Sequence, residues 1–281
     1  MNPDTLKGQF YKAAPTTLNN QLDKSFKSKR GPGATPTLAD DRDIDGIISP
    51  VYDYEYAAPC AAWAYSALAK SGFPDVFIIP FQADKTAVTE ETFTTPYDYV
   101  RVDQTFQREI KRKTGAEYDN DVFTDTDLVQ SQLPILQYTF SERQEAIKIA
   151  PIAISADKTL KSFALDLKEI AVDLSRSYRI ITPTNILQYG AEYSFVPFTQ
   201  QPLEKITELD KTTLGRIRGN EPLSLLEHVS ANHLSMNNYL GVVLNLLMIN
   251  PDSVAVEQYY TTHDVDGDES TIVSFAAITL R

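Results

Sequence analysis

A strand–helix–strand pattern in residues 147–182 constrains the fold more than any other feature of this sequence. Residues 147–154 form an apolar run with the length of a buried strand, and residues 178–182 form a second such run. Between them, apolar residues recur at the spacing of one helix face: Leu160, Phe163, Ala164, Leu167, Ile170, Ala171 and Leu174. A helix that joins two buried strands is typical of a right-handed parallel crossover, which needs helices on both faces of a sheet. The predicted fold class is therefore α/β.

Strands and helices alternate along most of the chain. The same patterns predict strands at 46–48, 76–79, 253–260 and 271–280, and helices at 18–26, 57–70, 103–113 and 240–249. Residues 27–45 lack periodicity and are expected to form an exposed loop. Because no later linker is long enough to separate domains, we expect residues 1–281 to form a single domain with a mostly parallel central sheet flanked by helices.

The charge balance argues against a nucleic-acid partner. The chain carries 38 acidic and 26 basic residues, a formal net charge of −12. Its lysines and arginines are scattered apart from a short run at Lys27, Lys29 and Arg30. Since proteins bind phosphate backbones through clustered positive charge, we expect no binding to nucleic acid.

Membrane insertion and secretion are not expected either. The longest apolar stretch, residues 240–249, spans about half of the roughly 20 residues that a membrane helix needs. Residues 1–25 lack the apolar core of a signal peptide. We therefore expect a soluble, cytoplasmic protein that does not bind membranes.

Few residues offer catalytic or metal-binding chemistry. Cys60 is the only cysteine, which excludes an internal disulfide and a zinc site of several cysteines. It lies in an alanine-rich apolar segment, which favours a buried, inert thiol. His228 and His233 are too far apart on a helix to share a face, and the Asp264–Asp268 run lacks the glycine and glutamate positions of a calcium loop. We expect neither a bound metal nor a cofactor.

Seven short segments, spread over nearly the whole chain, occur in a recognisable order. They are Gly8-Gln9-Phe10-Tyr11, Gly46-Ile47-Ile48-Ser49-Pro50, Ala57-Ala58, Val76-Phe77-Ile78-Ile79, Gln132-Leu133-Pro134-Ile135-Leu136, Ala150-Pro151-Ile152 and Gly241-Val242-Val243-Leu244-Asn245. Together they resemble the Memo family. The resemblance implies an α/β fold similar to that of the class III extradiol dioxygenases, which agrees with the predicted strand and helix order.

The resemblance also implies a metal-type pocket built from histidine, cysteine and aspartate, and this chain departs from it at each of those positions. The corresponding residues are Val51, Ala83 (or Gln82 if one residue is deleted), Asp127, Asn185, Gln188 and Ser235. Redox metals need imidazole or thiolate donors, whereas this set offers weak neutral groups and a single carboxylate. It also contains no general base that titrates near neutral pH.

The resulting hypothesis is a catalytically inactive Memo-like protein that binds a protein partner or a small ligand. The segment that follows Pro50 supplies a candidate binding rim at Tyr52, Asp53, Tyr54 and Tyr56, because tyrosines among acidic residues are typical of interfaces. These tyrosines are equally suited to fill the volume left by the metal ligands. Two alternatives stay open: an enzyme with an altered centre, and a non-catalytic subunit of an active paralogue.

Overall fold

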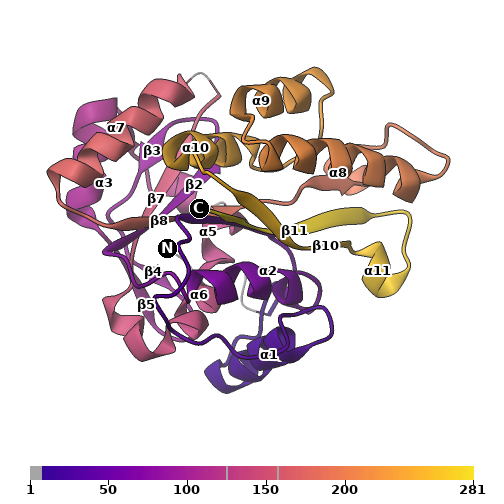
Figure 1. The fold of residues 1–281 in the computed structure, drawn as a ribbon, viewed down its shortest axis with the longest axis horizontal. Helices are drawn as coiled ribbons and strands as arrows, with labels where there is room; N and C mark the ends of the chain where they lie inside the picture. The colour runs from indigo at the N-terminus through magenta and orange to yellow at the C-terminus, as the bar shows by residue number, and fades with distance from the viewer. Residues whose placement is uncertain (1–7, 125, 157) are drawn as a thin grey trace.

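The computed structural model describes residues 8–124, 126–156 and 158–281 (Figure 1). Within this part of the chain, eleven strands form one mixed sheet in the order β10-β11-β1-β8-β2-β7-β3-β6, with β4, β5 and β9 attached beside this path. The strands are β1 (Gly46–Ser49), β2 (Val76–Gln82), β3 (Ala87–Val88), β4 (Phe93–Thr94), β5 (Tyr99–Val102), β6 (Glu117–Tyr118), β7 (Lys148–Ile154), β8 (Tyr178–Pro183), β9 (Leu187–Tyr189), β10 (Val254–Thr261) and β11 (Ile272–Leu280).

The centre of the sheet is parallel and its edges are mixed. Neighbours in the run β1-β8-β2-β7 pair in parallel, whereas β11 pairs antiparallel with β1, β9 and β10. On the other side, β3 pairs antiparallel with β7. The predicted α/β fold with helices around a central sheet is therefore confirmed. Its parallel part consists of the four central strands and β5, which pairs in parallel with β7, and β3 and β6 form a further parallel pair.

Helices cover both faces of the sheet. They are α1 (Pro15–Lys27), α2 (Tyr54–Leu68), α3 (Gln104–Thr114), α4 (Asp121–Thr124), α5 (Asp127–Gln130), α6 (Leu133–Thr139), α7 (Leu160–Asp173), α8 (Pro202–Arg218), α9 (Pro222–Ala231), α10 (Tyr239–Ile249) and α11 (His263–Asp266). Short 3-10 helices span Ser141–Ala146 and Ala191–Tyr193. Figure 1 shows α1, α2 and α6 on one side of the strands, with α7, α9 and α10 on the other.

Two apolar clusters fill the space between the sheet and these helices. Because side chains alternate along a strand, Phe77, Ile79 and Phe81 of β2 join the cluster under α1, α2 and α6. Val76 and Ile78 point to the opposite cluster, under α7 and α10. The predicted stripe of α7 belongs to this second cluster, and its central residue, Leu167, is completely buried.

Helix α2 begins three residues earlier than the sequence pattern predicts. The side chain of Asp53 accepts a hydrogen bond from the backbone nitrogen of Glu55 (2.8 Å), which satisfies one of the free N–H groups of the first turn. Most of this alanine-rich helix is buried, including Cys60. Burial raises the pKa of the Cys60 thiol well above its usual range, as expected for an unreactive cysteine.

The segment between α1 and β1 forms a loop held against the body of the protein. Between Ser28 and Asp45 the structure has neither helix nor strand, apart from one isolated bridge from Asp40 to Ser71. The carbonyl oxygen of Arg30 accepts hydrogen bonds from Trp63 Nε1 (2.9 Å) and Gln258 Nε2 (3.0 Å). In the described residues, no helix combines the length and hydropathy needed to cross a membrane.

Candidate functional site

The carboxyl edge of the parallel strands is the place where an open α/β sheet usually binds its ligand. In this chain β1 leads into Pro50 and Val51, β8 into Thr184 and Asn185, and β2 ends at Gln82. Six of the seven predicted pocket positions follow or lie close to these strand ends: Val51, Gln82, Ala83, Asn185, Gln188 and Ser235. The topology therefore collects them on one side of the sheet.

Val51 and Asn185 are locked together by a reciprocal pair of hydrogen bonds. The backbone nitrogen of Val51 donates to Oδ1 of Asn185 (3.0 Å), and Nδ2 of Asn185 donates to the carbonyl oxygen of Val51 (2.8 Å). Asn185 is completely buried and Val51 is 5% exposed. The amide thus mimics a strand pairing between the ends of β1 and β8, and neither residue presents a free group to a ligand.

Two further asparagines, which the sequence analysis missed, complete this closure. Oδ1 of Asn238 accepts from the backbone nitrogens of Gln82 (2.8 Å) and Gly241 (3.2 Å). Its Nδ2 donates to the carbonyls of Pro80 (3.0 Å) and Pro183 (2.7 Å). Asn238 therefore caps α10 while it ties the end of β2 to the end of β8.

Asn237 acts on the neighbouring strand end. Its Oδ1 accepts hydrogen bonds from the backbone nitrogen of Asn185 (2.8 Å) and from Oγ1 of Thr184 (3.1 Å). The sequence does contain one signal for Asn238: asparagine is preferred at helix N-termini, and this residue directly precedes the apolar segment 239–249. The contacts of Asn238 and Asn237 with the strand ends depend on tertiary structure and have no sequence signal.

The remaining positions of the edge are more open. The backbone nitrogen of Gln188 donates to the carbonyl oxygen of Ser235 (2.9 Å), so these two residues are neighbours. Gln82 and Ala83 line a depression of about 380 Å³ together with Asp84, Ser155, Ala156 and Asn237. Its polar lining consists mainly of amide and hydroxyl groups, which suits hydrogen bonding more than acid–base chemistry.

Asp127 is the seventh position and lies at the start of α5, a short helix that contacts β2. It is exposed, yet the surrounding protein desolvates its carboxylate and raises the pKa above the ordinary value. Its charge also acts on Tyr11, whose hydroxyl has a raised pKa mainly because it is buried and secondarily because of Asp127. The ring of Tyr11 packs on that of Tyr54, with 5.3 Å between centroids.

The four residues expected at the rim divide between surface and interior. Tyr54 differs from that expectation: it is only 4% exposed, and its hydroxyl donates to the carbonyl oxygen of Ser131 (2.5 Å). Tyr52 and Tyr56 are half-buried and contact each other edge to face, with ring centroids 5.6 Å apart. Asp53 is half-buried between them and serves as the cap of α2. Tyr54 thus occupies interior volume, while Tyr52 and Tyr56 reach the surface.

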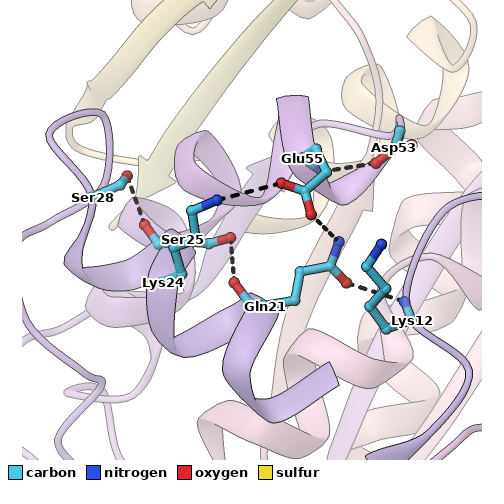
Figure 2. A network of polar contacts seen from close by, with 7 residues as sticks. All are labelled: Lys12, Gln21, Lys24, Ser25, Ser28, Asp53 and Glu55. Carbon is cyan, nitrogen blue, oxygen red and sulfur yellow. Dashed lines mark hydrogen bonds and ion pairs between the residues drawn. The ribbon is translucent and has the colours of Figure 1, made fainter. Parts of the chain in front are cut away.

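A polar network fixes the N-terminus of α2, and with it this rim, to α1 (Figure 2). Nε2 of Gln21 donates to the carboxylate of Glu55 (3.1 Å), and Lys24 lies 3.8 Å from the same carboxylate. Oε1 of Gln21 in turn accepts from the backbone nitrogen of Lys12 (3.1 Å). Gln21 is 8% exposed, whereas the side chains of Lys24 and Glu55 are 80% and 49% exposed, so the network is shielded from water at Gln21 only.

The residues at the implied metal positions do not fit a transition metal. Val51 and Ala83 have no donor atom, and the amide of Asn185 is already bonded to Val51. Gln188 and Ser235 offer neutral oxygen or nitrogen atoms, which are weak ligands for copper, iron or zinc. Within residues 8–124, 126–156 and 158–281 there is no group of three or more histidine, cysteine, aspartate or glutamate side chains that could hold a metal ion.

Comparisons with known proteins relate the whole chain to one family. The family model described as Memo-like protein matches residues 3–279. MEMO1 family protein MK0963 of Methanopyrus kandleri is 24% identical over 98% of this chain and 96% of its own length. A MEMO1 family protein of Pyrobaculum arsenaticum is 29% identical over 96% of this chain and 95% of its own length.

A solved structure shares the fold at low sequence identity. The crystal structure of the uncharacterized protein JW3007 from Escherichia coli K12 aligns with a TM-score of 0.54 and 10% identity, covering 85% of this chain and 100% of that one. At this identity the match supports the fold alone. The end-to-end match of the family model, together with these relatives, shows that the chain belongs to the Memo family.

Proposed function

We propose that this chain is a non-catalytic member of the Memo family that acts by binding a protein partner or a small polar ligand. The observation that carries the proposal is that side-chain amides join the strand ends. The polar side-chain atoms of Asn185 and Asn238 are hydrogen-bonded to backbone groups at the ends of β1, β2 and β8. Amides do not titrate near neutral pH and are poor ligands for redox metals, so they support binding rather than turnover.

The rim and the adjacent depression are the surfaces proposed to bind. Tyr52 and Tyr56 combine an apolar ring with a polar hydroxyl, a pairing that is enriched at interfaces. Their anchoring through Asp53 and Glu55 to α1 holds them in place before a partner arrives, which lowers the entropic cost of binding.

Metal content tests the non-catalytic part of the proposal. Untagged protein, purified and dialysed, is analysed for copper, iron, zinc and manganese by mass spectrometry. We expect far less than one equivalent of each. One equivalent that survives dialysis would support the enzyme with an altered centre and would overturn the proposal.

A pair of double variants tests the rim. Immobilised wild type, Tyr52→Ser/Tyr56→Ser and the control Tyr99→Ser/Tyr118→Ser are exposed to an extract of the source organism, and retained proteins are compared by mass spectrometry. The control removes two tyrosines that are 62% and 43% exposed elsewhere on the surface. We expect a partner retained by wild type and control and lost from the rim variant. Identical retention by all three folded proteins would contradict a binding role of the rim, and a retained Memo paralogue would identify the chain as its subunit.

A further inference from the structure

A large polar cavity, open to solvent, lies away from the carboxyl edge of the sheet. It has a volume of about 640 Å³ and is formed by α1, the loop segment 35–38 and the end of α6 with the residues that follow it. This volume lies within the range of small-molecule sites, about 300–1,000 Å³. None of the seven pocket positions or the rim residues lines it. It is therefore a separate feature, independent of the proposed function.

The cavity is lined by groups that form hydrogen bonds, without a positive charge. Two amides (Asn19 and Asn20) and two carboxylates (Asp23 and Glu142) face it from α1 and from the segment after α6. In the part of the chain that the structure describes, no lysine or arginine is among the lining residues. A phosphate or another anion would meet carboxylates there, so anionic ligands are disfavoured.

Several of these groups keep their hydrogen-bonding capacity for a ligand. Oδ1 of Asn19 accepts from the hydroxyl of Tyr97 (2.7 Å), which leaves its Nδ2 as a donor. The carboxylate of Asp23 forms an exposed ion pair with Lys27 of the same helix (2.7 Å). The exposed side chains of Asn20 and Glu142 form no hydrogen bond with the described residues of the protein.

Hydroxyl and ring groups complete the lining. Thr35, Thr37 and Ser141 add hydroxyls that both donate and accept, and Pro36 and Leu38 add small apolar surfaces. Tyr138 adds a half-buried ring, which packs against Phe26 with 5.3 Å between centroids. Its hydroxyl donates to Oδ1 of Asp23 (3.4 Å), so the ring is held in position.

Leu38 also borders a neighbouring hollow in the surface. A second depression of about 260 Å³ shares this residue and is lined by Phe73, Phe140, Asp40 and Arg143. The guanidinium of Arg143 covers the ring of Phe73 at 5.4 Å from its centroid. The two depressions lie against the same residue, and the second differs from the first in carrying a guanidinium beside its carboxylate.

We propose that the cavity of about 640 Å³ binds a neutral carbohydrate of two or more sugar rings. Sugars present many hydroxyls that each donate and accept, together with an apolar ring face, and amides, carboxylates and hydroxyls beside an aromatic ring match both properties. A polyamine is the competing small ligand because of the carboxylates. It is disfavoured because Asp23 already forms an ion pair with Lys27, which leaves Glu142 as the one carboxylate on this lining without an ion pair within the described residues.

Titration calorimetry with named probes tests the proposal. Wild type is titrated with cellobiose and with maltose, with glycerol as the small polyol control and spermidine as the cationic probe. We expect saturable binding of at least one disaccharide, and binding neither of glycerol nor of spermidine. No saturable binding of either disaccharide, or binding of spermidine alone, would overturn the proposal.

Variants locate the binding. Asn20→Ala/Glu142→Ala removes one exposed amide and one exposed carboxylate from the cavity, and Gln200→Ala/Glu208→Ala removes the same kinds of group from exposed positions elsewhere. Since each lost hydrogen bond costs about 1 kcal/mol, the first variant should weaken disaccharide binding about tenfold or more and the second should not. Equal affinities in two variants with wild-type circular dichroism and Tm would contradict this location.

Discussion

At the scale of single residues, the buried amides of the carboxyl edge have an architectural role. Asn238 makes four hydrogen bonds to four different backbone groups, which uses both atoms of its amide. Loss of such a partner leaves buried backbone groups unpaired, and each unpaired group costs about 1–3 kcal/mol. These residues therefore hold the ends of β2 and β8 and the residues that follow β1 together at the carboxyl edge.

Residue Leu167 provides a direct test of the packing of α7. Leu167 is completely buried, whereas Leu165 on the same helix is 60% exposed. Leu167→Ala should lower the free energy of unfolding by about 2–5 kcal/mol, because it removes buried methyl groups and leaves a cavity. Leu165→Ala should change it by less than about 0.5 kcal/mol. Urea denaturation of both variants checks this pair, and similar losses in the two would show that the helix packs differently.

A second residue-level prediction concerns Asp210. Its side chain on α8 is 1% exposed and accepts a hydrogen bond from the hydroxyl of Tyr259 (2.6 Å). Burial raises the pKa of Asp210 to about 6, although the neighbouring Ser274 hydroxyl and the hydrogen bond from Tyr259 partly oppose the shift. A carboxyl whose pKa is higher in the folded than in the unfolded state stabilises the fold at low pH, and this contribution is lost as pH rises through 6.

The variant Asp210→Asn should therefore gain stability relative to wild type as pH rises. The quantity to follow is the unfolding free energy of the variant minus that of wild type. It should increase by on the order of 2 kcal/mol between about pH 4 and pH 7.5, since each unit of pKa shift corresponds to about 1.4 kcal/mol. Glu208→Gln, at an exposed position of the same helix, should show little change. Urea denaturation at both pH values decides the matter: a pH-independent difference for Asp210→Asn would show that this carboxyl does not titrate in that range.

At the scale of elements, the sequence predicts those whose apolar pattern is long and regular. The helix at 160–173 and the strands at 148–154 and 272–280 lie where the patterns place them. Helices α8 and α9 were not predicted, although each begins with a proline at its first helical position. In α8 the buried face includes Asp210 and Thr213 besides Ile206 and Ile217, so its periodicity is weak in apolar residues alone. Asp210 is tied into the core by Tyr259 of β10, whereas Thr213 hydrogen-bonds Leu209 of its own helix and His228 of α9.

Glycines at two helices give a matched prediction at this scale. Gly115 ends α3 with a left-handed φ of 73°, and its backbone nitrogen donates to the carbonyl oxygen of Lys111 (3.0 Å). Gly215 lies inside α8, and an added Cβ would meet no atom within 4 Å at either position. Steric crowding is thus excluded at both sites, and only the backbone preference differs.

Gly115→Ala should lower the free energy of unfolding by about 1 kcal/mol, because alanine is strained in the left-handed region. Gly215→Ala should raise it by about 0.5–1 kcal/mol, because alanine loses less conformational freedom in a helix interior. Thermal and urea denaturation measure both. Changes of the same sign would refute the assignment of these two backbone conformations.

At the scale of the whole molecule, the sheet topology explains why part of the candidate site was predictable. Val51, Ala83 and Asn185 follow strands that the sequence patterns indicate, and parallel strands end on the same edge. The contacts of Asn237 and Asn238 with these ends arise only when the segment before α10 folds over the edge, which no local pattern shows. The cavity beside α1 likewise joins residues 19–38 with residues 138–142, a proximity created by packing.

The whole-molecule prediction is that the edge keeps the shape of a ligand-binding pocket without its ligands. Val51→His, Ala83→His and Ser235→Cys together should then create a set of two imidazoles and one thiolate that binds zinc. The backbone hydrogen bonds that position Val51 and Ser235 do not depend on their side chains, so the strand ends should hold. Single substitutions should have little effect, because one buried imidazole leaves the coordination sphere open.

Calorimetric titration of metal-free protein with zinc measures this gain. We expect measurable zinc binding by the triple variant. Its affinity should be lower than that of a natural site by roughly 10- to 100-fold for each carboxylate that would orient an imidazole, because Asn185 and Gln188 cannot take that role. A second triple variant, with Gln82→His in place of Ala83→His, tests which of these two residues corresponds to the family position. Gln82 is a candidate because its backbone nitrogen is bonded to Asn238 and its side-chain oxygen is buried without a partner among the described residues. Binding by one triple variant alone assigns the position that points into the pocket. If both are well folded and bind no more zinc than wild type, these strand ends do not converge on a common point, and the shape of the pocket has been lost together with its ligands.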